Sequence, residues 1–357
     1  MLVNMTDREK RLLIALVKMV DQYLDTREDL VDSFSMSAGE HAIEALADFG
    51  LMENVNSRFG RWTEAGNKFR AEAQALPQAF RDGIAKRSGM TLTYAIRGGR
   101  SGRERLRVLS HVLQAGTYDF LDRVGLRPGM ACLDVGCGGG DVTRELARRV
   151  GARGRVVGLD MDAAQLDIVR AEAAAQQISN IDYRVADVVD PPADVGSFDL
   201  VYTRFLLCHL TRPAKALSWM AKCLKPGGVL AIEDCDFTGH FCYPPLPAFD
   251  RYVALCGDVM RRRGGDPEIG LKLPQMLVEA GLSVGGVGVA HPSDVDGDAK
   301  LLNALTMENI SDAVVSDGLA TREEVDQLVA ALNKCVQDTR TFASVTRTIQ
   351  VWGRRSQ

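Results

Sequence analysis

This chain lacks the sequence features that mark several classes of protein. Its eight cysteines include no C-x-x-C pair and its five histidines no H-x-x-x-H pair, so the ligand spacing of a metal site is missing. No Gly-Lys-Ser/Thr follows a glycine-rich stretch, which argues against a Walker-type phosphate loop. No apolar run approaches the roughly 20 residues that cross a bilayer, and the run at 12–17 ends at Lys18. We therefore expect neither a bound metal nor a membrane partner.

An excess of charge of one sign is also missing. The 43 lysines and arginines against 47 aspartates and glutamates leave a net charge of −4, which provides no attraction for nucleic acid or an anionic membrane. Several cysteines lie in apolar runs and no secretory signal is present, so we expect reduced thiols in a cytoplasmic protein. A chain of 357 residues can form one large domain and a smaller one.

The most informative feature that is present is the segment 133–141, Leu-Asp-Val-Gly-Cys-Gly-Gly-Gly-Asp. The apolar run before it predicts a buried strand, and the pattern at 142–150 predicts a helix. Gly136 and Gly138 between them predict a tight turn at which a ligand approaches bare backbone, although such glycines also occur where a helix only packs close to a sheet. The next predicted strand, 154–159, ends in Asp160, which is placed to accept hydrogen bonds from ribose hydroxyls.

Two acidic residues beside the turn narrow the class of ligand that it can bind. Asp134 and Asp141 would repel the pyrophosphate of a dinucleotide, and they suit a ligand that carries a cationic amine. The motif resembles the first motif of class I S-adenosylmethionine (SAM)-dependent methyltransferases, with a core of the ubiquinone/menaquinone-biosynthesis type. The resemblance implies SAM as the methyl donor and S-adenosylhomocysteine as the product.

The later motifs of that family follow in order. They are the third strand, the fourth strand, the start of the helix after it, and the turn into the fifth strand, at residues 181–188, 197–204, 205–210 and 224–234. The resemblance covers roughly residues 94–355 and implies an α/β fold with a Rossmann-like sheet of seven strands. In this family the last strand, here 347–353, inserts antiparallel into the sheet.

The resemblance also implies which residues contact the cofactor. Asp160 would hold the ribose, Asp187 the adenine amino group and Asp134 the methionine ammonium. Arg204, at the tip of the fourth strand, would offer a carbonyl or a cation near the carboxylate. Tyr94 would cover the methionine end, unless it belongs to an ordinary surface loop. The full expected set is Tyr94, Asp134, Gly136, Gly138, Asp160, Met161, Ala186, Asp187, Val188, Arg204 and His209.

Methyl transfer by in-line displacement requires positioning and exclusion of water, and a base only when the acceptor loses a proton. The candidate catalytic residues are His209, Glu233 and His240. His209 offers a titratable imidazole, although it could instead cap or pack a helix. Glu233 and Asp234 are neighbours on a predicted strand and point to opposite faces, so at most one should enter the acceptor pocket.

The chain divides into three predicted parts: a small module at 1–76, a linker with leading helices at 77–129, and the domain with the glycine turn at 130–357. In the first, helices are expected at 7–24, 27–34 and 38–49, a hairpin at 51–63, and a further helix from Glu64. This pattern resembles a winged-helix module, which in plant-type O-methyltransferases contributes to dimerisation and to the substrate pocket. The third helix would carry three acids, Glu40, Glu44 and Asp48, which argues against DNA binding. A homodimer is the expected role, and mere packing is the alternative.

The acceptor has to be inferred from two predicted insertions, 237–265 and 294–341, the second of which has helical patterns at 299–315 and 321–338. The first is rich in aromatic residues and prolines, which favours a lid over an apolar or aromatic small molecule, or else a core beneath a long loop. The predicted function is methyl transfer to oxygen, nitrogen or carbon of a small organic acceptor. The alternatives are a methyltransferase for RNA or protein, and a SAM-binding winged-helix regulator.

Overall fold

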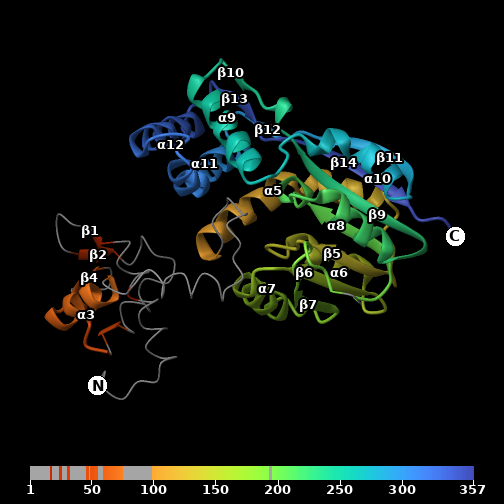
Figure 1. The fold of residues 1–357 in the computed structure, drawn as a ribbon, viewed down its shortest axis with the longest axis horizontal. Helices are drawn as coiled ribbons and strands as arrows, with labels where there is room; N and C mark the ends of the chain where they lie inside the picture. Colours follow the sequence, from red (N-terminus) through yellow and green to blue (C-terminus); the bar gives the residue numbers. More distant parts are fainter. Residues whose placement is uncertain are drawn as a thin grey trace. The chain divides into compact units, whose positions relative to one another are not determined.

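The structure is a computed structural model, and it describes residues 17, 24–25, 30–32, 46–47, 49–54, 59–74, 99–192 and 195–357. The chain divides into two compact units, Met1–Thr91 and Leu92–Gln357 (Figure 1). Because the helix at residues 99–123 belongs to the second unit, the leading helix expected before the first strand is part of the larger body. The finer boundaries at 76 and 129 stay predictions.

The first unit contains an antiparallel sheet of four strands in the order β1-β2-β4-β3, followed by helix α3. The expected hairpin and the helix from Glu64 are confirmed, and the helix over 27–34 is wrong, because part of that segment pairs as a strand with β1 and β4. A short apolar segment does not distinguish strand from helix by its periodicity alone. The winged-helix resemblance and the homodimer stay predictions, since most of residues 1–50 lie outside the described residues. The elements are β1 Leu24–Asp25, β2 Leu30–Asp32, β3 Met52–Asn54, β4 Phe59–Trp62 and α3 Glu64–Gln74.

The second unit is built on a sheet of seven strands in the order β11-β14-β9-β8-β5-β6-β7. All neighbouring pairs from β7 to β9 are parallel, and β14 inserts antiparallel between β9 and β11. This confirms the seven-stranded Rossmann-like sheet. The strands are β5 Ala131–Val135, β6 Arg155–Asp160, β7 Ile181–Val185, β8 Phe198–Arg204, β9 Leu224–Asp236, β11 Ser283–Ala290 and β14 Arg347–Arg354.

Helices cover both faces of this sheet, so its central strands are apolar on both sides. All five residues of β5 are buried: Cys132 faces a core that includes Phe120 of α5 and Leu146 of α6, and Leu133 faces one that includes Leu217 of α8 and Leu277 of α10. Packing on both faces of the sheet holds the strands in position, and the site lies at the carboxyl ends of these strands. The helices are α5 Gly99–Arg123, α6 Asp141–Val150, α7 Ala163–Ala175, α8 Pro213–Lys222 and α10 Leu273–Glu279.

The two insertions pack on each other and form a core of their own. Apolar residues of three helices meet there, among them Phe249, Met307 and Leu328, and a small sheet in the order β10-β13-β12 lies beside them (Figure 1). The predicted helices at 299–315 and 321–338 are confirmed. Phe249 and Tyr252 are buried, so these aromatics of the first insertion are core residues. The elements are η4 Phe237–Gly239, β10 Cys242–Tyr243, α9 Pro247–Arg262, η5 Ile269–Lys272, β12 Ser293–Asp294, α11 Asp298–Ser316, α12 Arg322–Gln337 and β13 Phe342–Ser344.

The segment after β8 differs from the prediction that 205–210 opens the next helix. It forms only a 3-10 turn, η3 Leu207–His209, and α8 begins separately at Pro213. Phe205 has a φ of +51°, outside the right-handed helical region, and a proline disfavours helical geometry in the residue before it. Proline is well suited to the first position of a helix, where its missing N–H costs nothing. Among the described residues, no helix is long and apolar enough to span a bilayer.

Candidate active site

The glycine turn joins β5 to α6 in a left-handed conformation. Gly136, Gly138 and Gly140 have φ values of +73°, +48° and +66°, a region that side chains strongly disfavour. A Cβ at Gly136 would lie 3.1 Å from Leu206 Cδ1, and one at Gly138 would lie 3.9 Å from Leu106 Cδ1. The turn therefore presents bare backbone, bordered by one leucine that precedes η3 and one from α5.

Asp160 is tied to this turn by hydrogen bonds. The Gly138 N–H donates to Asp160 Oδ2 at 2.8 Å, and the Asp162 N–H donates to Oδ1 at 3.0 Å. Burial raises the pKa of Asp160, and the two backbone donors oppose that effect. Each carboxylate oxygen keeps a further lone pair, so the group can still accept hydrogen bonds from a diol beside the turn.

Asp134 lies beneath the turn and is only 3% exposed. Its Oδ2 accepts a hydrogen bond of 2.6 Å from the Thr143 hydroxyl of α6. Burial raises the pKa of Asp134 to about 6, opposed by the Thr143 hydrogen bond and by the positive charge of Arg204. A buried carboxylate of this kind orders the turn and would be favoured in its charged form by a cation bound above it.

The ends of β6 and β7 carry exposed apolar side chains beside a carboxylate. Met161 is 45% exposed and Val185 is 56% exposed, whereas Val188 is buried. Asp187 is exposed, and its Oδ1 accepts from the Val189 N–H at 2.8 Å. The Ala186 N–H donates to the Asp160 carbonyl, which holds this segment against β6. Apolar surface next to an acceptor suits a flat heteroaromatic base that carries an amino group.

Arg204 lies at the end of β8 and is half-buried. Its Nη1 donates to Thr117 Oγ1 of α5 at 3.1 Å. Among the residues that the structure describes, no carboxylate lies within ion-pair distance of its guanidinium. Because a half-buried cation without a counter-ion is costly, Arg204 is suited to bind an anionic group of a ligand.

Glu233 is fully buried and serves as an anchor between elements. Its Oε2 accepts hydrogen bonds from the Thr117 hydroxyl at 2.9 Å and from the Tyr202 hydroxyl, and its Oε1 accepts from Gln350 Nε2 at 2.8 Å. These three donors belong to α5, β8 and β14. A carboxylate bonded in this way holds α5 on the sheet, and it also fixes Thr117, the partner of Arg204.

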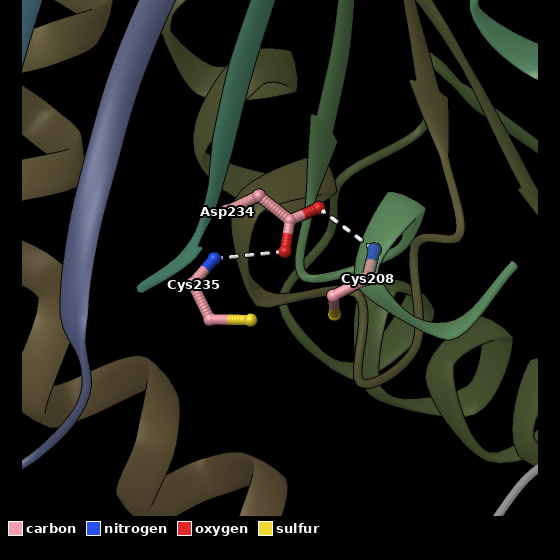
Figure 2. A group of neighbouring side chains, drawn as sticks. All are labelled: Cys208, Asp234 and Cys235. Atoms are coloured by element: carbon pink, nitrogen blue, oxygen red, sulfur yellow. Dashed lines mark hydrogen bonds between the residues drawn. The ribbon is translucent and has the colours of Figure 1, made fainter. Parts of the chain in front are cut away.

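Asp234, on the opposite face of β9, holds η3 in place, as Figure 2 shows. Its Oδ2 accepts from the backbone N–H groups of Leu207 at 3.0 Å and Cys208 at 3.3 Å, and its Oδ1 accepts from the Cys235 N–H at 2.8 Å. Within the described residues, Cys208, Asp234 and Cys235 could offer metal ligands within 4.8 Å of one another. Burial raises the pKa of the Cys208 thiol well above its ordinary value, and the carboxylate already accepts three hydrogen bonds, so the contacts fit a structural role. Glu233 and Asp234 thus point to opposite faces as expected, and both are buried.

The two candidate histidines differ in surroundings. His209 is half-buried in η3, and burial together with the charge of Arg105 lowers its pKa to about 4. His240 packs edge-on against Phe237 with ring centroids 5.0 Å apart, and its Nδ1 donates to the Phe237 carbonyl at 3.1 Å. Burial lowers the pKa of His240 to about 4 as well. These contacts give His240 a packing role within the first insertion. Tyr94 lies outside the described residues.

Sequence reasoning missed a polar group at the meeting of α5, α9 and α11. Arg105 Nε donates to Thr306 Oγ1 at 3.1 Å, and the Tyr252 hydroxyl donates to Asn303 Oδ1 at 3.3 Å. Asn303 and Thr306 lie three residues apart on α11, but that helix carries several other polar residues, so their spacing did not single them out. The other partners are too distant in sequence for any spacing to connect them.

Residues 133–232 match the family described as a methyltransferase domain. The chain is 30% identical over 217 residues to an uncharacterized 37.1 kDa protein in transposon TN4556 of Streptomyces fradiae, a match that covers 59% of this chain and 61% of that protein. It is 41% identical over 115 residues to a ubiquinone/menaquinone biosynthesis C-methyltransferase of Idiomarina loihiensis (32% of this chain, 46% of that one). It is 37% identical over 121 residues to a ubiquinone biosynthesis O-methyltransferase of Hahella chejuensis (34% and 49%).

The matched residues contain the glycine turn, Asp160, Asp187 and Arg204, and they form the parallel part of the seven-stranded sheet. This domain belongs to the class I SAM-dependent methyltransferases. Within that class it is similar to enzymes of quinone biosynthesis. The chain spans 61%, 46% and 49% of the lengths of these three relatives.

Proposed function

We propose that this protein transfers the methyl group of SAM to a small organic acceptor and releases S-adenosylhomocysteine. The observation that carries the proposal is Asp160 at the end of β6, whose carboxylate accepts the Gly138 N–H of a left-handed glycine turn. The carboxylate can accept hydrogen bonds from the ribose hydroxyls of a ligand, and the bare backbone beside it leaves room for the methionine chain of the same ligand. The match of residues 133–232 to methyltransferase domains supports the same conclusion.

The charges around the turn complement the three charged groups of SAM. Arg204 offers a cation to the methionine carboxylate, and Asp134 offers a buried carboxylate beneath the ammonium and sulfonium groups. Asp160 would take the ribose hydroxyls. Met161 and Val188 would flank the adenine, whose amino group would donate to Asp187. The protein supplies position and exclusion of water, and methyl transfer itself is an in-line displacement.

The acceptor atom is not fixed by the donor site, since the similar quinone-biosynthesis enzymes include both a C- and an O-methyltransferase. For an acceptor that loses a proton, His209 is the proposed base. It lies in η3 directly after the tip of β8, and its lowered pKa keeps the imidazole neutral at pH 7. Glu233 is left out of this role because all its contacts are with buried donors of the protein.

Calorimetric titration with SAM tests the donor site. Asp160→Ala should weaken SAM binding by about 10- to 100-fold, because hydrogen bonds to a charged group contribute roughly 1.5–3 kcal/mol. Asp167→Ala is the matched control, because that carboxylate is exposed on α7 and pairs with Arg170. Equal affinities for the two variants would refute the assignment. Mass spectrometry of a metabolite extract incubated with the enzyme and deuteromethyl-SAM would then identify the acceptor.

A further inference from the structure

A polar cluster lies where α5, η3, α9 and α11 meet. It contains Arg105, His209, Tyr252, Asn303 and Thr306, and we refer to it as the Arg105 cluster. Arg105 Nε donates to Thr306 Oγ1 at 3.1 Å, and the Tyr252 hydroxyl donates to Asn303 Oδ1 at 3.3 Å. The positive charge of Arg105 lowers the pKa of His209 and opposes the raised pKa of Tyr252, so both groups lie near it. Figure 1 shows α5, α9 and α11 together at one side of the sheet.

Arg105 has no acidic partner in the part of the chain that the structure describes. Its side chain is half-buried, and no acidic group of the described residues lies within ion-pair distance of it. By contrast, Arg144 pairs with Asp141 and Glu172, and Arg149 pairs with Asp122 and Glu145. The neighbours of Arg105 in the cluster are an imidazole, two hydroxyls and an amide. Removing a guanidinium from water without a counter-charge is unfavourable, and a ligand anion would offset that cost.

The cluster borders the proposed donor site. Leu106, the next residue of α5, is the nearest side chain to the Cβ position of Gly138, at 3.9 Å. Leu206, three residues before His209, lies 3.1 Å from the Cβ position of Gly136. The same two segments that cover the glycine turn therefore carry Arg105 and His209. A molecule held by Arg105 would lie next to the methyl donor.

We propose that the Arg105 cluster binds the methyl acceptor through an anionic oxygen, the carboxylate or phenolate of an aromatic acid, and that Arg105 determines this specificity. The inference rests on the proposed function and adds the substrate class. A guanidinium pairs with a carboxylate through two parallel hydrogen bonds. The Tyr252 hydroxyl, whose hydrogen bond to Asn303 is 3.3 Å long, can reorient toward the same anion, whereas the Thr306 hydroxyl donates to the Leu302 carbonyl and keeps Arg105 in place. Apolar residues beside the cluster, Leu106 and Phe205 among them, suit the ring.

Calorimetry of the full chain saturated with S-adenosylhomocysteine tests the proposal with matched probes. The probes are 4-hydroxybenzoate against 4-hydroxybenzamide for a carboxylate, and 4-nitrophenolate against nitrobenzene for a phenolate. In the parent protein the anion of at least one pair should bind about tenfold more tightly than its neutral partner, the size expected of a charge-assisted hydrogen bond. The pair that shows the preference identifies the anion.

Arg105→Gln should abolish the preference for the anion, and Arg105→Lys should retain part of it. Arg107→Gln, an exposed position two residues along the same helix, is the control and should leave the preference unchanged. A parent protein without any preference for the anions, or a preference that survives Arg105→Gln, would overturn the inference. If the parent protein does not bind S-adenosylhomocysteine, the proposed function is refuted instead, so the two failures are distinguishable.

Discussion

Replacing Glu233 separates a structural role from a catalytic one. Glu233 is fully buried and accepts hydrogen bonds from Thr117, Tyr202 and Gln350, each of which is also at most 1% exposed. Glu233→Ala removes the acceptor of the Thr117 and Tyr202 hydroxyls and one of the two acceptors of Gln350 Nε2. Glu233→Gln keeps the shape, because its amide oxygen can accept from Gln350 while its NH₂ group donates to the two hydroxyls, which can turn to accept.

The structure sets the size of each effect. A buried donor left without a partner costs about 1–3 kcal/mol, so Glu233→Ala should lower the free energy of unfolding by about 3–5 kcal/mol. Gln350 keeps its hydrogen bond to the Gly116 carbonyl, which limits the loss. Glu233→Gln should cost about 1 kcal/mol. Tyr202→Phe, which removes a donor and leaves the carboxylate its other partners, should cost about as much.

Urea unfolding measures the free energy of unfolding, and the rate at which S-adenosylhomocysteine forms in a metabolite extract measures turnover. If Glu233 anchors α5, Glu233→Gln should keep turnover within a few-fold of the parent, whereas loss of a general base would lower it by about 10²- to 10⁴-fold. A Gln variant that is as stable as the parent and yet has lost more than about 100-fold of its turnover would refute the reasoning.

Two further predictions concern Asp134 and His209. Because burial raises the pKa of Asp134 to about 6, the folded ligand-free protein retains a proton that the unfolded chain releases near pH 4, and stability falls as the pH rises from about 4 to about 6. In Asp134→Asn that decline should be smaller by up to about 3 kcal/mol, as calorimetric melting at pH 4–7 can measure; an identical decline would contradict it. His209→Ala should lower turnover by about 10²-fold or more and change SAM affinity by less than threefold. Because the pKa of His209 is about 4, the parent rate should show no fall between pH 7 and 5 from protonation of this group; an acidic limb near pH 6.5 that disappears in the variant would contradict it.

Much of the donor site was predictable because its signals are local. Strand, glycine turn and helix follow one another within residues 131–150, and the turn needs left-handed backbone that only glycine adopts readily. Asp160 ends a strand that must lie beside β5, because neighbouring parallel strands place their carboxyl ends at one edge. The hydrogen bond from Gly138 to Asp160 follows from that adjacency.

The acceptor side was less predictable because its contacts join distant segments. The roles of Glu233 and Asp234 depend on partners from α5, β14 and η3, so the sequence could show only that they point to opposite faces. His240 is a candidate base from its residue type, and the sequence could not show that its ring packs against Phe237. The segment 205–210 is expected to open the next helix. It forms η3 instead, because Phe205 has a left-handed backbone conformation and Pro213 starts a separate helix.

The sequence by itself determined the class of domain and the donor, because the glycine turn and the acids at the strand ends are short-range patterns tied to backbone geometry. Only the tertiary structure decided which polar groups the protein engages in its own contacts. Glu233 accepts a hydrogen bond from α5 and Asp234 accepts one from η3, so these carboxylates hold the two elements in place. Arg204 and Arg105 are half-buried, and no carboxylate of the described residues lies within ion-pair distance of either guanidinium. Each donates to a hydroxyl instead, Arg204 to Thr117 of α5 and Arg105 to Thr306 of α11.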